Sequence, residues 1–156
     1  MFCIQFRPLV CSDYSVICHF VNNSKELSFV LPQAQFPLSV EALARFVSLR
    51  EMPTVMLANN QPIAFACVHP PGINRTWSLA AIMVDNQFRG LGFGQILAKH
   101  MISCLREMLL EEVHVACCSD NVRALLMYQR LGFTPYAADF HEQSQFVRLR
   151  KILNIK

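Results

Sequence analysis

Three residues in the middle of the chain, Arg89, Gly92 and Gly94, form an Arg-x-x-Gly-x-Gly pattern with the chemistry of an anion-binding loop. They follow the apolar run 77–84 and precede an amphipathic stretch whose apolar spacing predicts a helix to about Met108. Glycines let a backbone approach a ligand closely, and a helix start presents free N–H groups with partial positive charge. Because Arg89 adds a full positive charge, the segment predicts a site for phosphate or pyrophosphate. The alternative is an ordinary surface turn before a helix.

Two other phosphate-binding loops fit this segment less well. A dinucleotide fingerprint begun at Gly90 and Gly92 requires a third glycine at position 95, which is Gln95. A P-loop requires Gly-Lys-Ser/Thr, and the sequence contains no such triplet. The spacing from Arg89 to Gly94 is therefore the pattern that holds.

A second segment, 115–133, predicts a strand, a polar turn and a helix that opens at Asn121. Tyr128 lies seven residues after Asn121, so the two side chains fall close to one helix face. Taken alone, an N-cap asparagine and a half-buried tyrosine explain this segment equally well.

Together the two segments resemble the GNAT superfamily of N-acetyltransferases, which transfer an acyl group from acyl-coenzyme A to an amine. The pattern from Arg89 to Gly94 is similar to its pyrophosphate loop. The pattern Asn121-x-x-Ala124-x-x-x-Tyr128-x-x-x-Gly132-Phe133 is similar to its second cofactor motif. The order of predicted elements matches across nearly the whole chain. The resemblance implies a single-domain α/β (α+β) fold, with a mixed, mostly antiparallel sheet of six to seven strands flanked by about four helices.

The resemblance also implies a site and a cofactor, acetyl-CoA. Tyr128 would protonate the departing thiolate, as a phenol near a thioester sulfur can. Asn121 would face the pantetheine region. The backbone of the preceding strand would pair with the pantetheine arm, and the loop amides would hold the pyrophosphate. These cofactor-binding residues are Ile82, Met83, Val84, Arg89, Gly90, Leu91, Gly92, Phe93, Gly94, Gln95, Asn121 and Tyr128.

The resemblance implies direct attack of an amine on the thioester, and an amine that arrives protonated must first lose a proton. Many relatives use a glutamate on one of the two central strands, but the runs 77–84 and 113–117 contain no acidic residue. Ala116 falls where some relatives carry a functional polar residue. The open candidates for a base are His69, His114, Glu112 and Asp139, or a water chain. A non-catalytic acyl-CoA sensor on the same fold, or a nucleotide-binding protein using the same loop, are the competing hypotheses.

The seven cysteines are odd in number and most lie in apolar runs, which favours reduced and mostly buried thiols. We expect Cys117 to be a packing residue, because His114 lies three positions earlier and would point to the opposite strand face. His100 and Cys104 share a helix face, but two ligands do not make a metal site, so no metal is expected. The basic residues Arg148, Arg150 and Lys151 are interpreted as a solvated strand edge.

Composition limits the remaining classes. The 156 residues are 53% hydrophobic and 16% charged, with a net charge of +3. This length favours one domain over 1–156, the apolar content excludes disorder, and no basic run of the nucleic-acid type appears. The uncharged stretch 52–74 is interrupted by Asn59-Asn60-Gln61-Pro62 and Pro70-Pro71-Gly72, which predicts two strands and no membrane span. The first residues lack a signal-peptide pattern, so a cytoplasmic location is expected.

The remaining elements position these motifs. The pattern predicts strands over 3–7, 54–58, 63–69, 77–84, 113–117, 135–139 and 145–152, and helices from Ser12 or Asp13 to about Val21, from Val40 to about Arg50, from the glycine loop to about Met108 and from Asn121 to Leu131. The run 22–38 stays ambiguous, because it is aromatic and apolar but is broken by Pro32 and Pro37. We expect this run, the strand end near His69 and a loop from Tyr136 to Ser144 to frame the acceptor site. The apolar part of the run, 27–38, is expected to line that site or to be buried in a homodimer.

Overall fold

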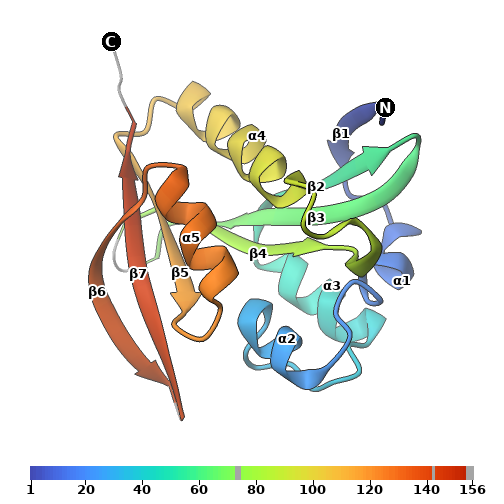
Figure 1. Cartoon of the computed structure of the whole chain (residues 1–156), viewed down its shortest axis with the longest axis horizontal. Helices are drawn as coiled ribbons and strands as arrows, with labels where there is room; N and C mark the ends of the chain where they lie inside the picture. The colour runs from blue at the N-terminus through green and yellow to red at the C-terminus, as the bar shows by residue number, and fades with distance from the viewer. Residues whose placement is uncertain (73–74, 142, 154–156) are drawn as a thin grey trace.

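The computed structural model describes residues 1–72, 75–141 and 143–153, and its centre is a seven-stranded sheet with the strand order β1-β2-β3-β4-β5-β7-β6 (Figure 1). Every neighbouring pair is antiparallel except β4 and β5. The predicted mixed, mostly antiparallel sheet is therefore confirmed. The strands are β1 (Ile4–Pro8), β2 (Glu51–Ala58), β3 (Gln61–His69), β4 (Ser78–Val84), β5 (Glu112–Cys118), β6 (Thr134–His141) and β7 (Ser144–Ile152). The helices are α1 (Asp13–Ile17), α2 (Ser24–Val30), α3 (Val40–Ser48), α4 (Phe93–Glu107) and α5 (Val122–Arg130).

The N-terminal helices differ most from the sequence prediction. The helix expected to reach Val21 ends at Ile17. At its first residue, the Asp13 carboxylate accepts hydrogen bonds from Arg7 at 2.7 and 3.0 Å and from the Val10 amide at 2.9 Å. The ambiguous run 22–38 contains a helix, α2, whose start is capped by Asn23 accepting the Glu26 amide at 2.8 Å. The later elements lie within a few residues of their predicted bounds. The hairpin turn is shorter than expected and uses only Asn59 and Asn60, both at positive φ.

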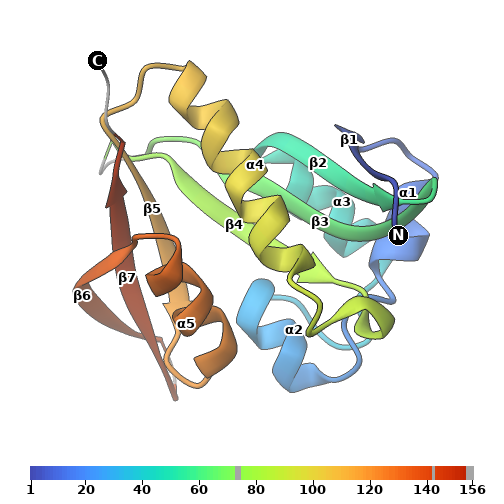
Figure 2. The ribbon, with the colours of Figure 1, turned by 45° about the horizontal axis from the view of Figure 1, so that its top comes forward.

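The sheet divides into two halves where β4 and β5 meet. These parallel strands pair only at Ser78–His114 and Leu79–Val115 and then separate. A bulge follows on β4, where Ala81 has a φ of +52° and the register with β3 shifts. Figures 1 and 2 show the two halves diverging beyond this point, with the start of α4 and all of α5 near the opening. The separation leaves one edge of the second half of β4 without a neighbouring strand.

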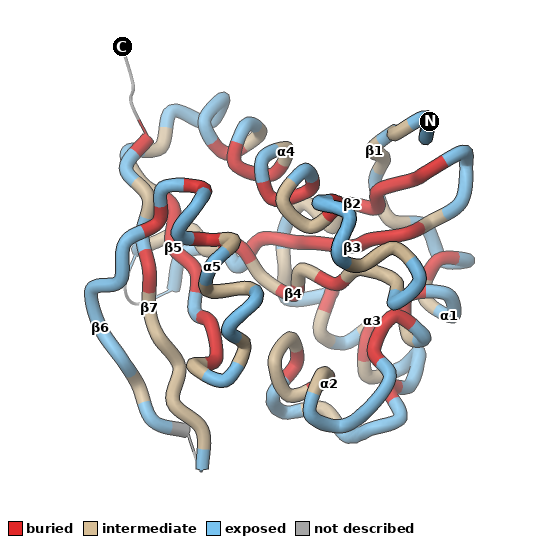
Figure 3. The backbone as a smooth tube through the Cα atoms, viewed as in Figure 1, coloured by how far each residue is buried: buried red, intermediate tan, exposed pale blue. Residues whose placement is uncertain are grey.

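Two apolar clusters lie on opposite faces of the sheet, and Figure 3 shows the buried strands between them. One cluster joins α4 and Tyr128 of α5 to the sheet, and the other joins α1, α2 and α3 to it. Leu27, Leu31 and Leu38 are buried in the second cluster. The apolar segment 27–38 therefore has a partner within the chain, and the high hydrophobic content is explained by helices covering both faces.

The hydrophobic composition raises two further points, the presence of a membrane-spanning helix and the burial of the cysteines. Among the described residues, no helix has the length and apolar character needed to cross a bilayer. All seven cysteines are free, but only Cys67, Cys117 and Cys118 are buried, so the expectation of mostly buried thiols is wrong. Cys3 and Cys11 are exposed because they flank the edge strand β1 at the start of the chain.

Candidate active site

The glycine loop closes one end of the opening between β4 and α5. Gly90 and Gly92 have φ values of +77° and +86°, a backbone region that favours glycine. Gly92 is the N-cap of α4 and provides no side-chain cap, so the first amides of this helix remain available to a ligand. The fifteen-residue length of α4 gives this end a full helix dipole. The loop thus has the backbone geometry of an anion site.

A groove of about 610 Å³ runs along this loop. Leu91 is 60% exposed and does not line the groove. Tyr128 lines a neighbouring cleft instead. The other residues expected to bind the cofactor all line the groove, and they are Ile82, Met83, Val84, Arg89, Gly90, Gly92, Phe93, Gly94, Gln95 and Asn121.

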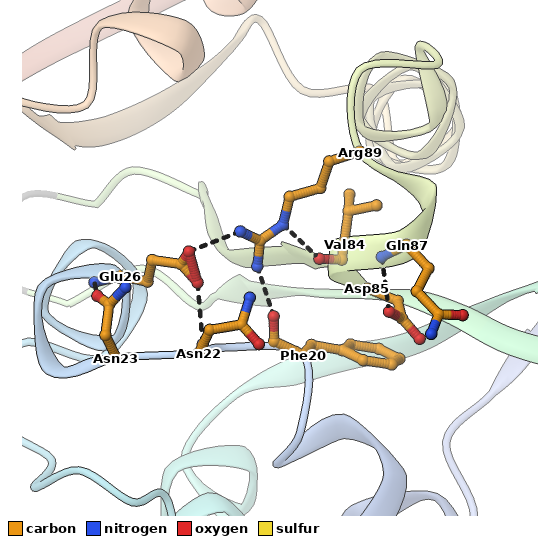
Figure 4. Close-up of polar contacts among 8 residues, drawn as sticks. All are labelled: Phe20, Asn22, Asn23, Glu26, Val84, Asp85, Gln87 and Arg89. Atoms are coloured by element: carbon orange, nitrogen blue, oxygen red, sulfur yellow. Dashed lines mark hydrogen bonds and ion pairs between the residues drawn. The ribbon is translucent and has the colours of Figure 1, made fainter.

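Arg89 makes contacts that the sequence does not predict. Its Nη1 atom donates to Glu26 Oε2 at 2.7 Å, its Nε atom donates to the Val84 carbonyl at 2.9 Å, and its Nη2 atom donates to the Phe20 carbonyl (Figure 4). The Arg89 guanidinium holds the pKa of the Glu26 carboxyl below its usual value. The side chain thereby links the end of β4 to α2 on the other side of the groove. A direct contact of Arg89 with pyrophosphate stays a prediction.

We expect Arg89→Gln to lower the free energy of unfolding by about 2 kcal/mol, because charge-assisted hydrogen bonds are lost at a partly buried position. Thermal unfolding without ligand measures this effect. Glu26→Gln is the matched variant, since it removes the ion pair and leaves the Arg89 charge in place. If Glu26→Gln tightens acetyl-CoA binding and leaves the unfolding temperature unchanged, the linking role is contradicted and Arg89 acts as a free cation toward the ligand.

A second cleft, of about 560 Å³, adjoins the groove and shares residues of β4, α2 and α5 with it. The segments expected to frame an acceptor site all contribute to its wall: Phe29, Val30 and Pro32 from the N-terminal segment, His69 from the end of β3, and Tyr136 and Asp139 from β6. The two clefts are therefore adjacent, with the glycine loop beside one and a pocket of apolar and polar groups in the other.

Tyr128 lines the second cleft and follows Met127, a residue that lines both clefts. Its side chain is 6% exposed, lines the second cleft and packs edge-on against Phe133 with ring centroids 5.6 Å apart. Burial, with a smaller contribution from Cys117, raises the pKa of the Tyr128 phenol well above its usual value. The hydroxyl therefore remains protonated at neutral and mildly alkaline pH, as a proton donor must.

Asn121 and Cys117 form the turn beside Tyr128. The Asn121 side chain accepts the Ala124 amide at 3.4 Å and caps α5 while lining both clefts. Burial, followed by the effect of Cys118, raises the pKa of the Cys117 thiol to about 12. A thiol with this pKa is not a nucleophile near neutral pH. Its position in the core cluster agrees with the packing role expected from the sequence.

The candidate bases differ in their surroundings. The His69 ring bonds the Pro70 carbonyl at 2.7 Å, and Asp139 is held in a close ion pair with Arg148. His114 is 7% exposed and bonds the Tyr136 hydroxyl at 2.7 Å. His114 thus has a hydroxyl partner that lines the cleft, whereas His69 bonds a backbone carbonyl and Asp139 a guanidinium.

Several groups at the site were missed in the sequence. Tyr136 was expected at the start of a loop, but it lies on β6. Arg123 and Arg130 of α5 line the groove and add positive charge to it. The sequence pattern of α5 predicts an amphipathic helix, but it does not indicate which of the polar residues on that helix face a ligand. Arg148 and Arg150 lie on β7 between β5 and β6, so the interpretation of a strand edge is wrong.

Metal chemistry has no visible ligand set in the part of the chain that the structure describes. Within 1–72, 75–141 and 143–153, no three His, Cys, Asp or Glu side chains are grouped to hold an ion. The His100–Cys104 pair is 3.7 Å apart, and the His100 ring stacks on Phe6 with centroids 3.8 Å apart.

A sheet that opens between β4 and β5, with a glycine loop at a helix start, defines an acetyltransferase fold. The chain belongs to the acetyltransferase (GNAT) family, whose model matches residues 20–133. This confirms the family resemblance drawn from the two motifs.

Individual relatives share parts of the sequence or the whole fold. The chain is 35% identical over 75 residues to a mycothiol acetyltransferase of Geodermatophilus obscurus, and 36% identical over 77 residues to that of Thermomonospora curvata. These matches cover 46% and 49% of this chain but only 24% and 25% of those proteins, so the chain spans about a quarter of the relatives' length.

Solved structures extend the likeness of the fold to nearly the full chain. The ribosomal-protein-S18-alanine N-acetyltransferase of Escherichia coli has a TM-score of 0.76 at 18% identity, covering 99% of this chain and 96% of that one. The spermidine N-acetyltransferase of Vibrio cholerae, solved with CoA and spermine, has a TM-score of 0.77 at 16% identity, covering 96% and 95%.

Proposed function

We propose that this protein is an acyl-CoA-dependent N-acyltransferase that transfers acetyl from acetyl-CoA to a primary amine of a small molecule or protein. One observation supports this most: Tyr128, a buried phenol that stays protonated, lines the second cleft next to Met127, which also lines the groove beside the glycine loop. The family model and the N-acetyltransferase names of the structural relatives support the same reaction class.

The chain offers suitable groups for both substrates. The free edge of β4 is suited to a pantetheine arm, and the amides after Gly92 to a pyrophosphate. The amine nitrogen would attack the thioester carbonyl directly, since Cys117 is too weakly acidic to form an acyl-enzyme. The C–N bond forms, the C–S bond breaks, and Tyr128 supplies a proton to the leaving thiolate. A single domain over 1–156, a cytoplasmic location and a homodimer remain proposals alongside this function.

The test is a thermal shift followed by an acceptor screen. At a hundredfold excess over its Kd, acetyl-CoA is expected to raise the free energy of unfolding by about 2.7 kcal/mol. The unfolding temperature should rise accordingly. The screen measures free thiol released with polyamines, amino acids and short peptides as acceptors. Absence of any shift at millimolar acetyl-CoA contradicts the proposal, and a shift without turnover favours the alternative of a non-catalytic acyl-CoA sensor. Displacement of acetyl-CoA by ATP at equal concentration would favour a nucleotide-binding protein.

A further inference from the structure

Glu112, His114 and Tyr136 form a contiguous chain of polar side chains, of which His114 and Tyr136 line the second cleft. The His114 Nδ1 atom lies 2.7 Å from the Tyr136 hydroxyl, and its Nε2 atom lies 3.2 Å from Glu112 Oε1. The second contact is within ion-pair distance but lacks hydrogen-bond geometry, so buried Nε2 has no hydrogen-bond partner among the described residues. A buried imidazole placed between a carboxylate and a phenol requires an explanation.

The neighbours of His114 determine which nitrogen carries the proton. The negative charge of the Glu112 carboxylate, 3.2 Å from Nε2, favours the proton of the neutral ring on that nitrogen. Nδ1 is then an acceptor, and the Tyr136 hydroxyl donates to it. This arrangement of hydroxyl, imidazole and carboxylate is the one by which enzymes draw a proton away from a reacting group.

The strands place this chain of groups on the cleft side of the sheet. Glu112, His114 and Ala116 alternate along β5 and share one face, whereas Val115 and Cys117 belong to the core cluster on the other face. Ala116 is exposed and lines the cleft, which leaves space beside His114. Tyr136 is 42% exposed and lines the same cleft, so its side chain can contact a bound molecule there.

Other charged groups surround these three side chains. Arg150 pairs with His114 across β5 and β7, and its guanidinium lies over the Tyr136 ring, 5.4 Å from the centroid. Arg148 and Asp139 form an ion pair in the same cleft, and His69 lines it from the end of β3. A proton that moves from Tyr136 to His114 would therefore leave its negative charge near Arg150 and carry its positive charge to a ring beside Glu112.

We propose that Tyr136, with His114 and Glu112 behind it, is the base that deprotonates the acceptor amine. The proposal rests on the proposed N-acyltransferase function, and it supplies the base that the central strands lack. The ammonium donates a proton to the Tyr136 oxygen as the Tyr136 proton passes to His114 Nδ1. The resulting imidazolium is held against Glu112, and the neutral amine attacks the thioester.

The protons balance over one turnover. The nitrogen loses two protons in becoming an amide, one before attack and one after it. One proton replaces the proton that Tyr128 gives to the thiolate, and the other leaves for solvent through partly exposed Glu112. No oxidant, metal or further reactant is required.

The experiment compares Tyr136→Phe and His114→Gln with the wild type, using the amine from the acceptor screen that releases thiol fastest. At neutral pH we expect kcat/KM for the amine to fall about 100-fold in each variant, the usual contribution of a general base. The deficit should shrink as pH approaches the pKa of the amine, because solvent then deprotonates it. Tyr14→Phe is the matched control, since Tyr14 lies on α1 and lines neither cleft.

Two readouts separate this proposal from simple misfolding and from failure of the proposed function. Acetyl-CoA affinity should be unchanged in both variants, because the glycine loop and β4 are untouched. Nitrogen NMR of the wild type without ligand should show His114 as the Nε2–H form. The proposal is overturned if His114 is the Nδ1–H form, or if both variants keep wild-type kcat/KM across the pH range. The NMR result stands even when no amine in the screen is acetylated.

Discussion

Replacing Tyr128 with phenylalanine is expected to lower kcat by about 100-fold or more while changing the KM for acetyl-CoA little. The phenol lines the second cleft next to Met127, which also lines the groove, and its raised pKa keeps it protonated. Phenylalanine preserves the ring and its edge-on contact with Phe133, so the fold should be retained. Steady-state release of free thiol, with a saturating amine, measures the change.

The pH dependence of Tyr128 has a defined sign. A donor is lost only when pH rises through its pKa, and burial has moved that pKa upward from about 10. The wild-type rate should therefore show no decline from loss of this proton up to about pH 10. An alkaline decline that disappears in Tyr128→Phe would contradict the raised pKa.

Cys117→Ser provides the matched control at the same place. Cys117 is buried beside Tyr128, and a serine there conserves shape while removing the thiol. Direct attack predicts turnover close to wild type in Cys117→Ser and its loss in Tyr128→Phe. The reverse pattern would indicate a covalent acyl-enzyme on Cys117 and exclude the role proposed for Tyr128.

The glycine loop could be predicted from the sequence because its chemistry is local. The positive φ values of Gly90 and Gly92 and the free amides of α4 depend on residues within one short segment. The helix capped by Asn23 was missed although Asn23 and Glu26 carry a capping signal. Apolar residues and the prolines at 32 and 37 obscured that signal in the run 22–38.

The contacts that cross the sheet could not be predicted in the same way. Tyr136 reaches His114 from 22 positions away, across a bulge in the pairing of β6 with β7. Arg89 reaches Glu26 from 63 positions away. Neither contact follows from hydrophobic period or motif spacing, because both depend on how the strands are ordered and how far β4 and β5 separate.

Replacing Gly92 with glutamate is expected to weaken acetyl-CoA binding by about 100-fold or more. A side chain at a φ of +86° introduces backbone strain of about 1–2 kcal/mol. A carboxylate there would also face the proposed pyrophosphate position at the positive end of α4, and repulsion of about 1–4 kcal/mol at contact distance supports the estimate. Titration by the acetyl-CoA-induced thermal shift measures the affinity.

Two further variants divide this effect into its causes. Gly92→Ala introduces the strain without the charge, so its loss of affinity should be smaller than that of Gly92→Glu. Gly94→Ala lies inside α4, where a new Cβ would meet Met127 and Val84 at 3.5 Å, an ordinary contact distance. It should therefore keep both stability and binding. If Gly92→Glu binds acetyl-CoA as well as Gly94→Ala does, the start of α4 is not the pyrophosphate site, whatever reaction the second cleft supports.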